Sequence, residues 1–363
     1  PSTPSRRRVD GVGSLMRLVL LLGAAAAAQQ QCTQRCRNEC NACILSYAII
    51  GARKAGTTSL YRWISAHPDA VGYGLNRGPR AGEVMYFSSD QLFPAKPVAC
   101  FGNACQNGRA CVNNVCQPPH QWYHHQFPCV TSKEVAGEAS VAYLVHAEAP
   151  RRLMEYCATK IPKIIALLRE PIARYESQFQ MRIRLKTRGY TPKSAADADM
   201  RRDVHAFCGV TKHHATWYLH PKPTGLFEPA RNGVYEGVYV AHLKRWRHAG
   251  FSVHTLFFEE FFSDDRQADH LRDVLRYIGL DPTKQDAHAT SKRKYNTKGA
   301  DFDYFPRHAF SSVAQRRLAV LFRPYTEGLA SFLGRPLPDA WARWPNATGD
   351  ACDESAWPRR PGW

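Results

Sequence analysis

The sequence predicts an α/β fold with a mainly parallel central sheet, because strand-like and helix-like segments alternate along the chain. Short apolar runs indicate buried strands, and each is followed by a longer segment whose apolar residues have helical spacing. Three such units pair residues 45–50 with 57–66, residues 163–168 with 172–186, and residues 253–258 with 269–280.

Glycine and proline mark the ends of these elements. Gly51 ends the first strand, and Pro68 prevents the following helix from continuing. Pro171 suits the first turn of the second helix, where its missing N–H loses no hydrogen bond. Pro282 follows the third helix. We also expect a helix over residues 238–248.

Two further expectations concern the middle of the chain. Residues 189–231 carry proline, histidine and charged residues without clear periodicity, so we predict a loop-rich stretch. His242 has neighbours at helical spacing, and a lone histidine in that position usually lines a helix face rather than reacting.

Composition limits the class of protein. The chain has 363 residues, 44% of them hydrophobic and 22% charged, which excludes disorder, collagen and coiled coil for its bulk. Lys and Arg number 49 against 31 Asp and Glu, a net charge of +18. Such an excess favours a polyanionic partner such as nucleic acid, an anionic membrane, a phosphorylated cofactor or an acidic polysaccharide, and charge alone does not choose among them.

The N-terminal region resembles a secretory signal peptide. Residues 18–28 are apolar, follow Arg17, and end in small residues. They are fewer than the roughly 20 residues that a membrane span needs. We expect a signal peptide that begins at Met16 and is cleaved near Ala28, with residues 1–15 as an upstream extension. A buried helix and an uncleaved short anchor are the alternatives.

Twelve cysteines agree with a secretory route. An even count in a chain with a signal peptide predicts disulfides formed in an oxidising lumen, and zinc is the alternative at the pair Cys40 and Cys43. The Asn- and Gly-rich stretch around residues 95–120 holds four of the cysteines and is predicted to be a disulfide-stapled insertion. The cysteines stand at positions 32, 36, 40, 43, 100, 105, 111, 116, 129, 157, 208 and 352.

These observations give a domain plan. It consists of an upstream extension and signal peptide over 1–28, a cysteine-rich lead-in over 29–44, one α/β domain over 45–345, and a tail over 346–363. The tail begins with a glycosylation sequon at Asn346.

The loop after the first strand has the features of an anion site. Residues 51–59 read GARKAGTTS and would place free backbone N–H groups at a helix N-terminus. The pattern differs from a nucleotide-hydrolysing Walker A loop, because Thr57 follows Gly56 where lysine is required, and the lysine is Lys54 instead. An ordinary glycine-rich turn is the alternative.

This pattern, GxxKxGTTSL, resembles the 5′-phosphosulfate loop of sulfotransferases that use 3′-phosphoadenosine 5′-phosphosulfate (PAPS). The resemblance implies a P-loop-like, three-layer fold with a mainly parallel sheet flanked by helices, plus disulfide-rich insertions. It implies that Lys54 contacts the bridging region of the phosphosulfate. The residues that it implies at the 5′-phosphate are Ala55, Gly56, Thr57, Thr58 and Ser59.

A second motif follows the strand over 163–168. Arg169 offers a planar fork for a phosphate, and Ser177, about two turns into the next helix, can add a hydrogen bond. The run RxPxxRxxSxF resembles the 3′-phosphate motif of the same sulfotransferases, which implies that Arg169 and Ser177 bind the 3′-phosphate. Arg174 is expected to form an ion pair. Lys298 and Gly299 resemble the family's late cofactor loop, and a solvated basic loop is the alternative.

The candidate catalytic residues are Lys54 and Glu83. Sulfuryl transfer needs a base for the acceptor proton and positive charge at the leaving group, so no metal is expected. The segment GEVMYF resembles the KExxFF segment of heparan-type sulfotransferases, whose glutamate is the proposed base, but Gly82 replaces the lysine and Met85 a frequent histidine. A surface carboxylate is the alternative for Glu83, and the rival bases are His124, His125 and His146.

Two softer motifs, WYxxxFP from residue 122 and GEASxxY from residue 137, strengthen the resemblance to Golgi carbohydrate sulfotransferases of the heparan and glycosaminoglycan type. It implies a PAPS-dependent enzyme of the Golgi lumen or secreted space that sulfates a hydroxyl or amino group of a glycan, with an acidic one favoured by the charge. Alternatives are a tyrosylprotein or small-molecule sulfotransferase and a non-catalytic polyanion-binding protein. Nucleic acid is not an expected partner, and a membrane is one only through an uncleaved N-terminal segment.

Overall fold

The computed structural model describes most of the predicted catalytic domain. The described residues are 43–73, 82–89, 105–106, 109–112, 115–117, 123–157, 160–184, 194–211, 232–263, 265–292, 310–342 and 348–353. The predicted signal peptide, Lys298, Gly299 and Asn346 lie outside them. Among the described residues, no helix combines the length and apolarity needed to span a membrane.

A five-stranded sheet of order β2-β6-β1-β7-β8 forms the centre, and each neighbouring pair of strands is parallel. The central position of β1 and β7 agrees with their apolar sequences, because β1 and residues 164–168 of β7 are buried, as central parallel strands usually are. The predicted α/β class is confirmed. The strands are β1 (Tyr47–Gly51), β2 (Ala70–Gly72), β6 (Val135–Glu138), β7 (Lys163–Leu168) and β8 (Val253–Phe257).

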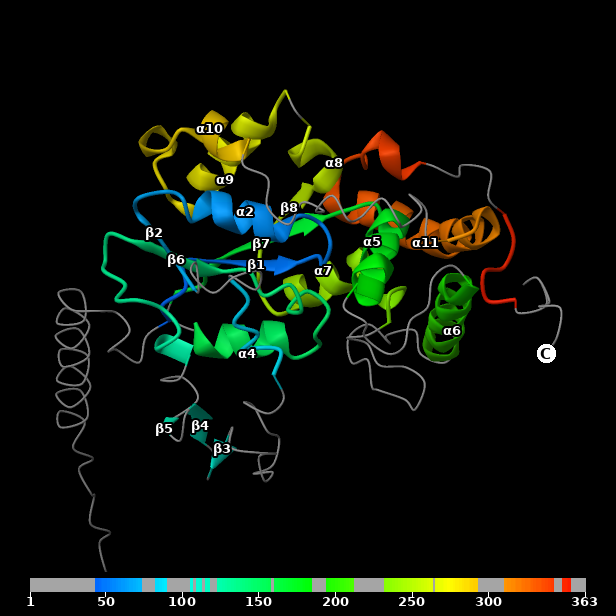
Figure 1. Cartoon of the computed structure of the whole chain (residues 1–363), viewed down its shortest axis with the longest axis horizontal. Helices are drawn as coiled ribbons and strands as arrows, with labels where there is room; N and C mark the ends of the chain where they lie inside the picture. The colour runs from blue at the N-terminus through cyan, green and yellow to red at the C-terminus, as the bar shows by residue number, and fades with distance from the viewer. Residues whose placement is uncertain are drawn as a thin grey trace, which may run out of the picture.

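Helices cover both faces of the sheet and one end of it (Figure 1). One face carries α2 (Thr57–Ile64), α8 (Phe258–Phe261), α9 (Gln267–Ile278) and α10 (Ala287–Ser291). The other carries α4 (Ala149–Tyr156) and α7 (Tyr239–His248). Beyond the end toward which the arrow of β1 points lie α5 (Pro171–Arg184), α6 (Ser194–Thr211) and α11 (Ser312–Leu333). Short 3₁₀ turns are η5 (Tyr235–Gly237), η6 (Pro282–Lys284) and η8 (Asp339–Trp341).

Helix α6 corrects one prediction, because residues 194–211 are helical although the stretch was expected to be loop-rich. Four of its buried apolar residues follow at intervals of four, four and three, which is helical spacing. They are Ala196, Met200, Val204 and Phe207.

The cysteine-rich insertion contributes a separate antiparallel sheet of order β3-β4-β5. Its strands are β3 (Cys105–Gln106), β4 (Arg109–Val112) and β5 (Val115–Gln117).

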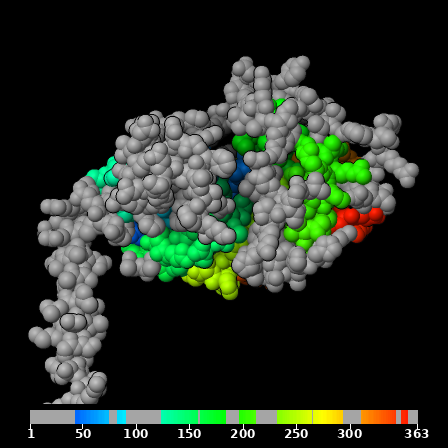
Figure 2. All heavy atoms as spheres, turned by 90° about the horizontal axis from the view of Figure 1, so that it is seen from below, coloured from blue at the N-terminus to red at the C-terminus, as the bar shows by residue number. Residues whose placement is uncertain are grey.

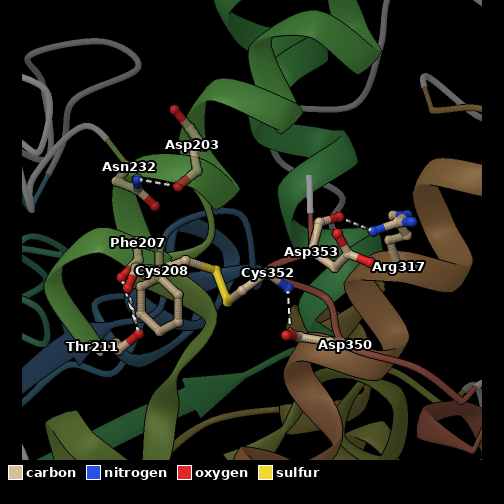
Figure 3. The surroundings of a disulfide bond; sticks show 9 residues. All are labelled: Asp203, Phe207, Cys208, Thr211, Asn232, Arg317, Asp350, Cys352 and Asp353. Atoms are coloured by element: carbon tan, nitrogen blue, oxygen red, sulfur yellow. Dashed lines mark hydrogen bonds between the residues drawn. A yellow bond between two sulfur atoms is a disulfide. The ribbon is translucent and has the colours of Figure 1, made fainter. Parts of the chain in front are cut away.

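Two disulfides join described residues that lie far apart in the sequence. Cys43 is bonded to Cys157 at a Cα–Cα distance of 4.8 Å, so its sulfur is not a zinc ligand as the alternative reading had it. Cys208 of α6 is bonded to Cys352 at a Cα–Cα distance of 5.7 Å. Figure 3 shows this second bond between α6 and the C-terminal segment, where Arg317 of α11 also donates a hydrogen bond to the carbonyl oxygen of Asp353 at 3.0 Å. From below, the segment is the red surface beside green α6 (Figure 2).

His242 lies on the buried face of α7, as its spacing predicted. Its side chain is fully buried, and Nε2 lies 2.8 Å from the carbonyl oxygen of Tyr235. Burial, followed by the nearby charge of Arg245, lowers the pKa of His242 from 6.5 to about 3. The imidazole is therefore neutral in the folded protein.

We predict that His242 makes the fold sensitive to acid. Between pH 6.5 and about 3, the unfolded chain binds a proton at His242 that the folded chain does not. The free energy of unfolding therefore falls as the pH is lowered, by up to about 1.4 kcal/mol per pH unit from this group. Denaturant titrations of the wild type and His242→Gln across this range measure the difference. Equal slopes for the two proteins would contradict it.

Candidate functional site

The loop between β1 and α2 turns tightly around an open helix N-terminus. Lys54 has φ of 69° and Gly56 has φ of 88°, so two of its residues are in the left-handed region. At Gly56 an added Cβ would lie 2.5 Å from Cε2 of Phe262. A glycine is therefore required there both by the backbone and by the aromatic ring packed against it.

The start of α2 offers hydrogen-bond donors to an anion. The amides of Thr57 and Thr58 have no acceptor within the helix because they belong to its first turn. No side chain of the described residues caps this end, and no acidic residue lies in its first turn. The hydroxyl groups of Thr57, Thr58 and Ser59 likewise make no hydrogen bond within the described part of the chain. The amides and hydroxyls at the start of α2 can thus donate hydrogen bonds to an anion together.

Arg169 lies against this loop. It follows β7, the neighbour of β1 in the sheet, and its Nη1 donates a hydrogen bond to the carbonyl oxygen of Lys54 at 3.1 Å. The guanidinium lies 4.7 Å from the ring centre of Phe258, and its buried Nε has no hydrogen-bond partner among the described residues. Burial lowers the pKa of Arg169, but a guanidinium remains charged. The structure thus joins the two motifs that the sequence predicted.

Ser177 lies on α5, whose first turn is capped by Glu170. The two carboxylate oxygens of Glu170 accept hydrogen bonds from the amides of Ile172 at 2.9 Å and Ala173 at 2.7 Å. This cap fixes the direction in which α5 leaves β7. Ser177 is half-buried, and its hydroxyl makes no hydrogen bond to any other described residue.

A buried ion pair joins the loop to α5. Arg174 is fully buried and contacts Glu236 of η5 at 3.4 Å, and it also donates to the carbonyl oxygen of Gly233. Glu236 accepts further hydrogen bonds from Gln178 at 2.7 Å and from Arg53 of the loop at 3.2 Å. The ion pair expected for Arg174 is confirmed. Its partner could not be inferred from spacing, because the two residues lie 62 positions apart.

The Glu83 segment (residues 82–89) packs on α2. Gly82 has φ of 93°, and an added Cβ would lie 2.6 Å from two ring atoms of Tyr61. The ring of Tyr61 thus occupies the space that a side chain at position 82 would need, which explains why a lysine is absent there. Glu83 is half-buried, and Met85 is left-handed with φ of 60°.

The rival bases have different surroundings. His124 is buried, with Nε2 at 2.6 Å from the hydroxyl of Tyr156, whereas His125 is exposed and His146 half-buried. Among the residues that the structure describes, no group of three or more histidines, cysteines or carboxylates could hold a metal ion.

Glu138 is a buried carboxylate that sequence reasoning missed. It ends β6, is fully buried, and accepts hydrogen bonds from Tyr123, Ser140, Tyr143 and the amide of Val84. Burial raises its pKa from 4.5 to about 7. The available signal was the GEASxxY motif, in which a glutamate ends a buried strand.

Several curated proteins similar in sequence to this chain are sulfotransferases. No family model matches the chain. It is 24% identical over 244 residues to human heparan sulfate glucosamine 3-O-sulfotransferase 3B1, which covers 66% of this chain and 47% of that protein. It is 26% identical over 153 residues to the membrane-associated sulfotransferase kil1 of Dictyostelium discoideum, covering 41% of this chain and 26% of that protein. The chain spans about half the length of the 3-O-sulfotransferases it matches.

A solved structure shows the same fold. The sulfotransferase from Alicyclobacillus acidocaldarius aligns with a TM-score of 0.55 at 22% identity, covering 83% of this chain and 100% of that one.

We predict that removing Glu236 destabilises the protein strongly. Glu236→Gln leaves the charge of Arg174 buried and uncompensated, which costs about 3–5 kcal/mol. Denaturant unfolding of this variant is compared with Glu148→Gln, which removes an exposed partner of Arg151 and costs no more than about 1 kcal/mol. Similar losses in both variants would contradict the structural role of the buried pair.

Proposed function

We propose that this chain, which is similar in sequence and fold to sulfotransferases, transfers the sulfuryl group of PAPS to a glycan. The observation that carries this proposal is the contact between Arg169 and the β1–α2 loop. It brings one predicted phosphate site beside the other, and PAPS carries phosphate groups at both ends of its ribose.

The donor would lie along the ends of β1 and β7. The amides and hydroxyls of residues 55–59 would hold the 5′-phosphate at the start of α2. Arg169 and Ser177 would bind the 3′-phosphate, for which a planar guanidinium is well shaped. Lys298 and Gly299, in the late loop, complete the proposed donor site.

The transfer itself needs two further groups. Lys54 would stabilise the negative charge that develops on the leaving phosphate. Glu83 would take the proton from the acceptor hydroxyl or amine as that group attacks sulfur in line with the departing oxygen. This scheme needs no metal ion.

We propose a glycosaminoglycan or other acidic glycan as the acceptor. The printed names of several relatives specify heparan sulfate glucosamine, and the net charge of +18 favours a polyanion. We also propose a location in the secretory pathway, either Golgi or secreted, which agrees with the disulfides. The catalytic domain would occupy residues 45–345, with the insertion near 95–120 on its acceptor side.

Sulfate transfer from radiolabelled PAPS to heparan sulfate tests the donor site. Lys54→Ala and Arg169→Ala should each lower kcat/KM by about 100-fold or more, because each removes a charge that faces the transferred group or the donor phosphates. Lys163→Ala is the matched control, since the exposed Lys163 begins β7 and lies at the opposite end of this strand from Arg169. Normal transfer by either site variant would overturn the proposed donor site.

Replacement of Glu83 tests the proposed base. Glu83→Gln should keep wild-type affinity for adenosine 3′,5′-bisphosphate, while kcat for transfer to heparan sulfate falls by about 100-fold or more. The amide keeps the size of the side chain but cannot accept the acceptor's proton. Unchanged turnover would exclude Glu83 as the base, and His124→Gln, His125→Gln and His146→Gln would then identify the alternative.

A further inference from the structure

We propose that Glu138 is a positioning residue that orients the Glu83 segment for catalysis. This inference rests on the role proposed above for Glu83, but the hydrogen bonds that support it are independent of that role. Glu138 does not face the reacting groups, because its side chain is fully buried at the end of β6. It acts through the backbone that carries Glu83.

Four donors converge on the carboxylate of Glu138. One oxygen accepts from the hydroxyls of Tyr123 at 2.6 Å and Tyr143 at 3.0 Å. The other accepts from the hydroxyl of Ser140 at 2.5 Å and the amide of Val84 at 3.3 Å. An ionised carboxylate is the side chain that only accepts hydrogen bonds at both of its oxygens, so it suits this set of donors.

Two of these hydroxyls also accept hydrogen bonds from backbone amides of the Glu83 segment. Ser140 accepts a hydrogen bond from the amide of Met85 at 2.8 Å, and Tyr143 accepts one from the amide of Phe87 at 3.3 Å. Since Val84 donates directly, three amides that closely follow Glu83 are tied to Glu138. The segment itself contains no helix or strand, so these bonds take the place of a helix or sheet ladder.

Buried aromatic side chains and Arg152 surround this hydrogen-bond arrangement. Tyr86 stacks on Tyr123 at a centroid distance of 4.7 Å, and Phe87 meets Tyr123 edge to face at 5.3 Å. Arg152 donates a hydrogen bond to the carbonyl oxygen of Phe87 at 3.1 Å. In so buried a place, an unmade hydrogen bond is costly. The conformation of the segment is therefore linked to the state of one carboxylate.

Protonation of Glu138 should weaken the link. A proton adds a fifth hydrogen where four donors already converge, so at least one donor must turn away. Among the described residues, four tyrosines would interact with the charge of Glu138, and burial keeps them neutral by raising their pKa. They are Tyr47, Tyr61, Tyr123 and Tyr143. Because the pKa of Glu138 is raised to about 7, its charge is lost in mildly acidic solution.

Hydrogen exchange of the full chain tests the proposal directly. In the wild type above pH 7, the amides of Val84, Met85 and Phe87 should be protected. Glu138→Ala should lower their protection factors by about tenfold or more, and Glu138→Gln by less, because its amide still provides one acceptor. Ser140→Ala should affect Met85 most, and Tyr143→Phe should affect Phe87 most. Protection in the wild type should also fall as the pH drops through about 7.

Asp203→Asn is the matched control. Asp203 is a half-buried carboxylate that accepts hydrogen bonds from the hydroxyl of Tyr175 at 2.6 Å and from the amide of Gly233 at 2.7 Å. Its replacement should lower protection at Gly233 and leave residues 82–89 as in the wild type. The inference would be overturned if residues 82–89 kept wild-type protection in Glu138→Ala. It would also be overturned if these residues lost protection in Asp203→Asn as well.

Activity then separates positioning from general loss of folding. Glu138→Gln should bind adenosine 3′,5′-bisphosphate as the wild type does, while kcat for transfer to heparan sulfate falls about tenfold and KM changes little. Equal losses in nucleotide binding and turnover would contradict a positioning role. Failure of the wild type to bind the nucleotide would instead reject the proposed function, and the exchange experiment would still decide the role of Glu138.

Discussion

The hydrogen bond from Nη1 of Arg169 to the carbonyl oxygen of Lys54 links two segments that lie 115 positions apart in the sequence. It can form because β1 and β7 are parallel neighbours, so their carboxyl ends reach the same edge of the sheet. The proposed donor site depends on this arrangement, since it places a guanidinium beside the open start of α2. The left-handed backbone at Lys54 and Gly56 then directs the loop around the position that an anion would take.

Buried charges hold the walls of this site in place. Arg174 and Glu236 connect α5 and η5 to Arg53 of the loop, and Glu138 holds the Glu83 segment. Removing a partner from a buried charge is costly, so each cluster favours the backbone conformation that keeps these contacts. The two clusters lie on either side of β1, one toward the donor motifs and one toward the candidate base.

The sequence predicted the parts of the fold that have local signals. The strand over 163–168 has the predicted bounds, because an apolar run defines it. The helix predicted over 172–186 spans Pro171–Arg184, with the proline in its first turn as expected. The short strands β2 and β6 and the helix α6 escaped prediction. Three or four residues are too few to show a period, and the buried positions of α6 are diluted by charged neighbours.

The candidate site likewise contains residues that the sequence predicted and residues that it did not. Lys54, Arg169 and Ser177 were proposed from the sequence because each sits in a motif that follows a strand. Glu236 was not predicted, since its importance comes from burial and from partners distant in sequence, which have no local pattern. Glu138 lies in the GEASxxY motif, but the partners that surround its carboxylate could not be inferred from that motif. The replacement of a lysine by Gly82 was visible in the sequence, but its cause, the ring of Tyr61, was not.

Calorimetric titration with adenosine 3′,5′-bisphosphate tests the central claim most directly, because it needs no knowledge of the acceptor. The account predicts tight binding of this nucleotide and much weaker binding of adenosine 5′-monophosphate and of ATP, both of which lack the 3′-phosphate that Arg169 and Ser177 are proposed to hold. Equal binding of all three nucleotides, or no binding by a folded sample, would contradict the account and favour a polyanion-binding protein on the same fold.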